Sequence, residues 1–210
     1  MAMDEALLEF AREAGRPTLR FYGWSEPAAS FGYFQRYAEV ERLTTLRPLV
    51  RRPTAGGIVP HDRDWTYSLA FPTDHPWHGF KAVESYRTVH VWLQEAFLRV
   101  GVETEVASEA RRVLAGQCFA GHEKFDLLLR GRKIAGAAQR RTRQGLLIQG
   151  SIRPDGLMFA REVWEQAMAG TLPENVASGW AAYVPDERLI VRAEELARGK
   201  YALPGYNRKR

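Results

Sequence analysis

The chain has 210 residues, of which 45% are apolar and 26% are charged, and its formal net charge is +5. These proportions exclude an intrinsically disordered chain, and the length favours a single domain over residues 1–210. One cysteine excludes an internal disulfide bond, and the basic balance points to acidic partners.

The first third of the chain is predicted to form one helix and four short strands. Apolar side chains recur at helical spacing over residues 3–14, and Gly15 is a natural helix end. Alternation of apolar and polar residues predicts strands over residues 19–24, 30–33, 49–52 and 65–71. The last two are expected to enter and leave a glycine-rich loop.

The rest of the chain should supply the other helices and a run of neighbouring strands. The longest helix is predicted over residues 82–100, with one face formed by Val83, Tyr86, His90, Leu93, Phe97 and Val100. A hairpin around Arg130 and Gly131 and a further strand follow, over residues 126–129, 133–138 and 146–152. Two more helices are predicted over residues 157–169 and 186–198. The class is therefore α+β, with a central, mostly antiparallel or mixed sheet flanked by helices.

The glycine-rich loop reads Arg51-Arg52-Pro-Thr-Ala-Gly56-Gly57. Glycines between two strands let the backbone approach a ligand closely, and the two arginines are placed to meet a phosphate or carboxylate. The spacing matches neither a P-loop nor a dinucleotide-binding fingerprint. A Gly-Gly turn is also typical of a plain hairpin, so the loop alone does not establish a binding site.

Lys133 follows a tight turn and begins a strand of small residues, Ile134-Ala-Gly136-Ala137-Ala. A lysine in this position can be partly buried, with its donors held in one direction. The small residues beside it leave room for an acyl chain or a carbonyl group. The alternative is a turn lysine that lies in solvent.

Cys118 is the only thiol in the chain. A lone cysteine is usually a small buried apolar residue, and a nucleophilic one needs a nearby cation or base. Lys133 lies fifteen residues later, and His122 lies in the same loop as the cysteine. The sequence leaves both open as partners of the thiol.

Other features argue against several kinds of site. His75 and His78 have no further ligands at metal spacing, so no metal site is expected. No motif of a nucleic-acid-binding module is present, so no nucleic-acid partner is expected. The start of the sequence lacks the basic and apolar regions of a signal peptide, and no apolar run has the length of a membrane span. We therefore expect a cytoplasmic protein without membrane contact.

The order of motifs along the chain resembles the lipoate–protein ligase and octanoyltransferase superfamily. The resemblance rests on Met3-Asp-Glu-Ala-Leu-Leu8, Leu19 to Trp24, Ser30-Phe-Gly-Tyr-Phe-Gln35, the arginine–glycine loop, His61-Asp62, Tyr67-Ser68, Gly131-Arg-Lys-Ile-Ala-Gly-Ala-Ala-Gln139, and the Lys200-Tyr201 end. It spans almost the whole chain. It implies a single domain with the fold of the biotin/lipoate ligase catalytic domain.

Within that superfamily the chain is most similar to the cysteine-dependent octanoyltransferases and the related amidotransferases, because Cys118-Phe119 precedes the Gly-Arg-Lys strand. The resemblance implies that Cys118 forms an acyl thioester and that Lys133 stabilises its thiolate. The residues implied to line the acyl channel are Gly56, Gly57, Gly136 and Ala137. Those implied to position the loop and the carbonyl are Arg52, His61 and Ser68.

The activity implied is octanoyl transfer from acyl carrier protein to a lysine of a lipoyl-domain protein, without a cofactor. The acceptors would be the glycine cleavage H protein or the E2 subunit of a 2-oxoacid dehydrogenase. Such partners are typically acidic, which suits the basic chain.

Three alternatives stay open at this point. An ATP-dependent lipoate ligase would use ATP and Mg²⁺, place Lys133 on an acyl-adenylate and leave Cys118 incidental. An amidotransferase would move the acyl group between two protein lysines. A non-catalytic acyl-binding relative is the third, because Ala55 stands where the loop usually has its first glycine and Gln149 where the family usually has a histidine.

Overall fold

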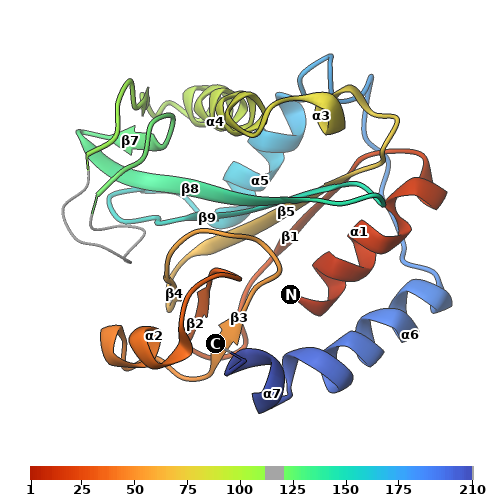
Figure 1. Ribbon diagram of the computed structural model, residues 1–210. Coiled ribbons are helices and arrows are strands. Elements are labelled where there is room, and N and C mark those ends of the chain that lie inside the picture. Colours follow the sequence, from red (N-terminus) through yellow and green to blue (C-terminus); the bar gives the residue numbers. More distant parts are fainter. Residues whose placement is uncertain (112–120, 210) are drawn as a thin grey trace.

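Two β-sheets and a set of flanking helices make up the part of the chain that the computed structural model describes, residues 1–111 and 121–209 (Figure 1). The strands are β1 (Thr18–Tyr22), β2 (Ala28–Phe31), β3 (Leu49–Arg51), β4 (Val59–His61), β5 (Trp65–Phe71), β6 (Glu105–Val106), β7 (Leu127–Leu129), β8 (Arg132–Arg141) and β9 (Leu146–Ile152). The helices are α1 (Ala2–Ala14), α2 (Tyr37–Leu43), α3 (Pro76–Gly79), α4 (Ala82–Arg99), α5 (Arg161–Gly170), α6 (Glu187–Leu196), the π-helical turn η1 (Ala197–Tyr201) and α7 (Pro204–Asn207).

The larger sheet has the strand order β1-β5-β9-β8-β7-β6, and each neighbouring pair is antiparallel. Its centre is β9, in which every residue is buried. In the smaller sheet β2 is the middle strand, parallel to β3 and antiparallel to β4. The α+β class with an antiparallel or mixed sheet is therefore confirmed.

The two faces of the larger sheet have different coverings. Helices α4 and α5 cover one face, whereas α1 lies toward the other face with α6 packed along it (Figure 1). On β5 the odd-numbered Tyr67, Leu69 and Phe71 join the main core with α4 and α5. The neighbouring Ala70 belongs instead to the cluster between α1 and α6. This alternation is what a strand between two layers requires, because successive side chains point to opposite faces.

Several elements form where the sequence predicts them. Helix α1 ends at Gly15, which takes a left-handed conformation with φ 61°. The turn between β7 and β8 has φ 52° at Arg130 and φ 74° at Gly131, as a tight two-residue hairpin demands. The long helix forms as α4, but its predicted face is partly wrong. Val83 is 57% exposed, while Val89 and Trp92 are buried.

The prediction for the glycine-rich segment is also corrected. The chain does not pass from this segment directly into residues 65–71, because β4 comes first. Moreover, β3 and β4 both pair with β2 and not with each other, so the segment is not a plain hairpin. Strand β2 stops at Phe31, two residues earlier than expected.

The C-terminal helices differ from prediction at their ends. Helix α5 begins at Arg161, four residues later than predicted, and Gly156 before it has a positive φ of 87°. Asp186 is the N-cap of α6, accepting a hydrogen bond from the Leu189 backbone N–H at 2.8 Å. Short elements such as α2 and α7 carry too little periodicity to be found from sequence. Within the described ranges, no helix is both long enough and apolar enough to cross a membrane.

Candidate active site between the two sheets

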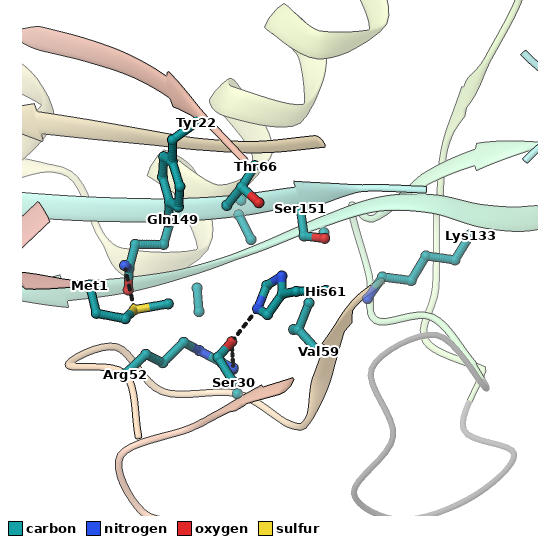
Figure 2. A pocket seen from close by; sticks show the side chains of 15 residues that line it. Met1, Tyr22, Ser30, Arg52, Val59, His61, Thr66, Lys133, Gln149 and Ser151 are labelled. Atoms are coloured by element: carbon teal, nitrogen blue, oxygen red, sulfur yellow. Dashed lines mark hydrogen bonds between the residues drawn. The ribbon is translucent and has the colours of Figure 1, made fainter. Parts of the chain in front are cut away.

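A pocket lies between the larger and the smaller sheet, with Lys133 toward one end and Met1 and Gln149 toward the other (Figure 2). Its lining residues are Met1, Tyr22, Ser30, Arg52, Gly56, Val59, His61, Thr66, Lys133, Gly136, Ala137, Ala138, Gln149, Gly150 and Ser151. Six of the residues proposed from the sequence therefore meet here, namely Arg52, Gly56, His61, Lys133, Gly136 and Ala137. Gly57 and Ser68 are not among the lining residues.

Arg52 holds the glycine loop closed from inside. Its guanidinium donates to the carbonyl of Ala55 at 2.7 and 3.1 Å and to that of Gly57 at 2.7 Å. The loop also packs tightly on Gly32, the residue after β2, because a Cβ atom there would lie 2.0 Å from the Gly56 carbonyl oxygen. Gly57 thus contributes a backbone oxygen to the arginine.

Arg51 fastens the neighbouring backbone in the same manner. It is fully buried and donates to the carbonyls of Tyr33 and Gln35, each at 2.7 Å, and to that of Asn207. Backbone carbonyls in a loop lack the partners that a strand or helix would provide. The two arginines supply charged hydrogen-bond donors to these carbonyls and so fix the loop backbone.

Lys133 is held by an ion pair and does not extend into solvent. Its Nζ lies 2.7 Å from Oδ2 of Asp126, and its side chain is only 8% exposed. Asp126 is fully buried and also accepts from the Glu123 backbone N–H at 2.6 Å and from the hydroxyl of Tyr86. Burial, with the charge of Asp126, raises the pKa of Tyr86 well above its usual value, so this hydroxyl stays a donor. The alternative of a solvent-exposed turn lysine is excluded.

His61 lies in the pocket wall between two hydrogen-bond partners (Figure 2). Its Nδ1 is 2.8 Å from Oδ2 of Asp64, and its Nε2 is 2.7 Å from Oγ of Ser30. The Trp24 ring stacks on the imidazole at 3.9 Å. Burial lowers the pKa of His61, although Asp64 opposes the shift. The imidazole is therefore neutral near pH 7.

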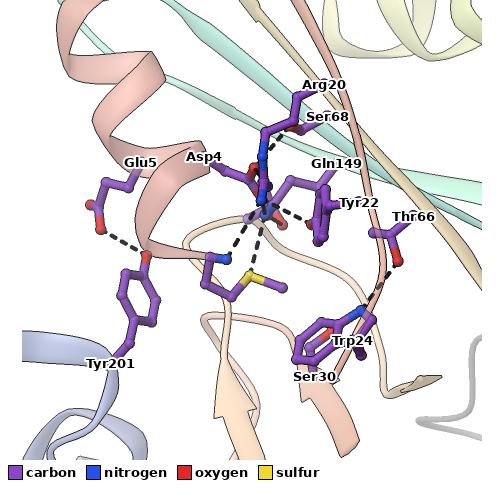
Figure 3. Close-up of polar contacts among 12 residues, drawn as sticks. Asp4, Glu5, Arg20, Tyr22, Trp24, Ser30, Thr66, Ser68, Gln149 and Tyr201 are labelled. Carbon is purple, nitrogen blue, oxygen red and sulfur yellow. Dashed lines mark hydrogen bonds and ion pairs between the residues drawn. The ribbon is translucent and has the colours of Figure 1, made fainter. Parts of the chain in front are cut away.

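Asp4 is the centre of a polar cluster behind the far end of the pocket (Figure 3). Its Oδ1 accepts from Arg20 at 2.7 Å and from Ser68 at 2.8 Å, and its Oδ2 accepts from Tyr22 at 2.9 Å. Burial by itself raises the pKa of Asp4, but the Met1 amino group, Arg20 and the hydrogen bonds hold it below its usual value. Ser68, which the resemblance assigns to positioning the loop and the carbonyl, thus uses its hydroxyl to donate to Asp4.

Gln149 connects the same cluster to the glycine loop. Its Nε2 donates to Asp4 at 2.7 Å, and its Oε1 accepts from the hydroxyl of Thr54 at 2.8 Å. Both ends of the amide are thus used, and the residue joins β9 to α1 and to the loop. Gln149 is therefore held in place in the pocket lining by hydrogen bonds at both ends of its amide.

Sequence reasoning missed several residues of the site. Asp64 and Asp126 each hold a predicted residue, and Ser30 and Tyr22 lie in the lining. A usable signal was the spacing of His61 and Asp64, because a carboxylate near a histidine often orients its ring. The others approach the site only through the tertiary fold.

Cys118 and Phe119 lie outside the described residues. His122 forms an isolated β-bridge with Arg111. The choice between Lys133 and His122 as a partner for the thiol therefore stays a prediction. Among residues 1–111 and 121–209, no group of three His, Cys, Asp or Glu side chains is arranged to hold a metal ion.

The fold is similar to that of lipoate-protein ligases. A lipoate-protein ligase A bound with ATP matches with a TM-score of 0.81 and 20% identity, covering 99% of this chain and 92% of that chain. A bi-partite lipoate protein ligase from Thermoplasma acidophilum matches with a TM-score of 0.71 and 19% identity, covering 99% of this chain and 89% of that one. At these identities the likeness establishes the fold.

Sequence similarity then establishes the family. Residues 1–176 match the lipoyl protein ligase A/B catalytic domain, and the chain belongs to this family. It is 36% identical over 168 residues to the octanoyltransferase LipM of Geobacillus kaustophilus, covering 74% of this chain and 60% of that protein. The corresponding values for the octanoyltransferase LipM of Staphylococcus aureus are 39% over 168 residues, 74% and 61%. The chain thus spans about 60% of the length of the curated relatives that it matches.

Proposed function

We propose that this protein is an acyltransferase that moves an octanoyl group onto a lysine of a lipoyl-domain protein. The observation that carries the proposal is its identity of 36% to 39% with octanoyltransferases over 168 residues. The pocket agrees with this activity, because small and apolar residues line it beside a held lysine. The identity to the ATP-bound ligase is 20%, which supports a shared fold and no more.

The proposed reaction has two steps. The thiolate of Cys118 attacks the thioester of octanoyl–acyl carrier protein, and the carrier thiol leaves. The amine of a lipoyl-domain lysine then attacks the new thioester, and the Cys118 sulfur leaves as an amide forms. No cofactor takes part in either step.

Lys133 supplies a fixed positive charge for this chemistry. Asp126 holds its ammonium group in one place, so little reorganisation is needed when negative charge develops on the thiolate or the oxyanion. Gly136 and Ala137 form the wall beside it, and Arg52 keeps the glycine loop closed over the pocket. Charge on the partners matters as well, since a chain of net charge +5 attracts acidic carrier and lipoyl domains.

The partners proposed are acyl carrier protein as donor and, as acceptor, the glycine cleavage H protein or an E2 subunit. A ligase of similar fold has been solved as part of a lipoylation system with its E2 lipoyl domain. A cytoplasmic location completes the proposal.

Intact-protein mass spectrometry tests the thioester. The purified chain is mixed with octanoyl–acyl carrier protein without ATP, alongside Cys118→Ala, Lys133→Ala and, as a control, the exposed Lys124→Ala. We expect the wild type and Lys124→Ala to gain one octanoyl group, Cys118→Ala to gain none, and Lys133→Ala to load at least about 100-fold more slowly.

Three results would contradict the proposal. If Cys118→Ala still gains an octanoyl group, a thioester on Cys118 is ruled out as the intermediate. Octanoylation or lipoylation of a lipoyl domain that proceeds only with ATP would identify a ligase instead. An amidotransferase would accept the octanoyl group from an octanoylated lipoyl protein and not from acyl carrier protein.

A further inference from the structure

A buried chain of three polar side chains opens into the pocket. Asp64 lies 2.8 Å from Nδ1 of His61, and Nε2 of His61 lies 2.7 Å from Oγ of Ser30. All three residues are at most 9% exposed, and Ser30 and His61 line the pocket that contains Lys133. This is the Asp–His–Ser order of a general-base relay, which is recognised by geometry and not by sequence position.

The hydrogen bonds give the chain a direction. Oδ2 of Asp64 is an acceptor in this cluster, since it also accepts from Ser151 at 2.7 Å and from Thr66 at 3.2 Å. His61 must therefore donate through Nδ1, which leaves Nε2 as the acceptor of the Ser30 hydroxyl proton. The Ser30 hydroxyl thus donates to His61, and His61 in turn donates to Asp64.

Arg52 completes the geometry from the other side of the serine. Its Nη1 donates to Oγ of Ser30 at 3.3 Å, so the oxygen accepts one hydrogen bond while the hydroxyl donates another. Trp24 stacks on His61 and holds the ring plane. Each member of the relay is thus fixed by neighbours, as catalytic groups require.

The position of Ser30 favours proton transfer over nucleophilic attack. Ser30 lies in β2, the middle strand of its sheet, which is paired with β3 on one side and β4 on the other. Nucleophilic serines of acyl hydrolases instead sit at a sharp turn, where free backbone N–H groups form an oxyanion hole. Because β2 is paired on both sides, its backbone N–H groups are used in the sheet and cannot form an oxyanion hole.

We propose that Ser30, His61 and Asp64 relay a proton away from the attacking lysine amine in the amide-forming step. The proposal rests on the proposed acyl transfer and adds catalytic residues to it. An amine that attacks a thioester carries an excess proton in the tetrahedral intermediate, and an amide forms only when that proton leaves.

The protons and bonds balance as follows. The amine nitrogen forms a bond to the acyl carbon, and its proton passes to Oγ of Ser30 while the Ser30 proton passes to Nε2 of His61. Asp64 stabilises the imidazolium that results. The carbon–sulfur bond then breaks, and the proton returns through Ser30 to the departing thiolate, which restores the neutral relay.

The surroundings of His61 keep it able to accept this proton. The charged groups that act on it are Asp64, Arg52 and the Met1 amino group, and burial is the largest influence. Together they lower its pKa, so the ring is neutral at pH 7 and becomes protonated only in more acidic solution. Amide formation should therefore decline as the pH falls below the pKa of His61.

The test separates the two half-reactions. Enzyme is loaded with octanoyl–acyl carrier protein, the acyl-enzyme is isolated, and it is then mixed with a lipoyl domain between pH 5 and pH 8.5. The variants are Ser30→Ala, Ser30→Thr and Asp64→Asn. Ser85→Ala is the matched control, because this buried serine also makes a 2.8 Å hydrogen bond, to Gln139, outside the pocket lining.

We expect loading to fall far less than amide formation in each relay variant. Amide formation should fall by at least about 100-fold in Ser30→Ala and Asp64→Asn. The part of its decline at acidic pH that His61 contributes should disappear, which leaves the slope set by protonation of the acceptor lysine. Ser30→Thr, which keeps the hydroxyl, should recover much of the rate. Ser85→Ala should behave like the wild type.

Three results would overturn the relay. They are an unchanged rate of amide formation in Ser30→Ala, an equal fall in both half-reactions, or an octanoyl group attached to Ser30 itself. If the wild type does not take up an octanoyl group at all, the proposed function fails first and the relay fails with it. Thermal unfolding of Ser30→Ala identifies a folding defect, and Asp64→Asn then decides the matter independently.

Discussion

Gly136 leaves the space that the Lys133 side chain occupies. A Cβ atom at this position would lie 2.7 Å from Cε and 2.8 Å from Nζ of the lysine, and 3.2 Å from Oδ1 of Asp126. Contacts this short force one partner to move, and the flexible end of a lysine moves most easily. Glycine is therefore suited to position 136 because it leaves room for the Lys133 ammonium group, and not because the backbone there needs an unusual conformation.

We predict that Gly136→Ala folds normally but loses most of its activity. The displaced ammonium group would no longer meet the developing charge, which should lower kcat by about 10-fold to 100-fold. The unfolding free energy should fall by about 1 to 3 kcal/mol, because the displaced lysine weakens its ion pair with the buried Asp126. Single-turnover kinetics and urea denaturation measure the two effects.

Gly79→Ala is the matched control for this variant. Nothing lies within 4 Å of a Cβ atom at Gly79, which is at the end of a short helix away from the pocket. It should alter neither activity nor stability appreciably. Wild-type activity in Gly136→Ala would show that the exact place of the lysine does not matter.

The C-terminal elements are fastened to the site by a few side chains. Asn207, at the end of α7, accepts from the Arg51 backbone N–H at 2.8 Å and donates to the Tyr201 carbonyl at 2.8 Å. At the other end, Lys200 and Tyr201 both donate to Glu5 of α1. The π-helical turn and α7 thus connect α1 to β3, the strand that leads into the glycine loop.

Asn207→Ala should loosen this connection. The variant leaves the Arg51 backbone N–H and the Tyr201 carbonyl without their partner, so the unfolding free energy should fall by about 1 to 3 kcal/mol. Amide hydrogen exchange should increase in η1, α7 and β3 before it increases in β9. Acyl transfer should weaken less than stability, because the pocket lining itself is unchanged.

The exposed Asn175→Ala is the control for that change. It should leave both exchange and stability as in the wild type. Equal exchange in the two variants would mean that α7 is held by its apolar contacts and not by Asn207.

At the scale of the whole molecule, a buried histidine couples stability to pH. His90 on α4 is fully buried, its Nδ1 lies 2.8 Å from the Tyr86 carbonyl, and its Nε2 has no hydrogen-bond partner among the described residues. Burial lowers the pKa of His90 to about 4. A proton on Nε2 would place an unpaired charge in the core.

We predict that the folded state loses stability as the pH falls from about 6.5 toward about 4. In this window the unfolded chain binds a proton at His90 that the folded chain does not, so each pH unit costs on the order of 1 kcal/mol. His61, whose pKa is also lowered, acts in the same direction. Above about pH 6.5 neither histidine contributes a slope.

Urea denaturation across this range measures the effect. His90→Leu should flatten the dependence on pH, whereas His78→Gln, which changes a histidine away from the main core, should not. An equal slope in the wild type and in His90→Leu would assign the pH dependence to His61 and the carboxylates.

Local features of the chain were sufficient to predict much of the fold. The helix that ends at Gly15, the hairpin at Arg130-Gly131 and the strand over residues 146–152 follow from periodicity and turn chemistry. These properties depend on residues near one another in the sequence, and strong local preferences survive folding. The order of motifs likewise predicted the family.

The contacts of the site depended on the tertiary structure instead. Nothing local pairs Lys133 with Tyr86 through Asp126, or brings Ser30 to His61 and Arg52. The resemblance assigns Ser68 to positioning the loop and the carbonyl, whereas its hydroxyl donates to Asp4, which lies 64 residues earlier on α1. The residue types and their local elements can be deduced from the sequence because they follow from short-range physics. Which charge meets which partner is decided only when the two sheets and α1 pack together and exclude water between them.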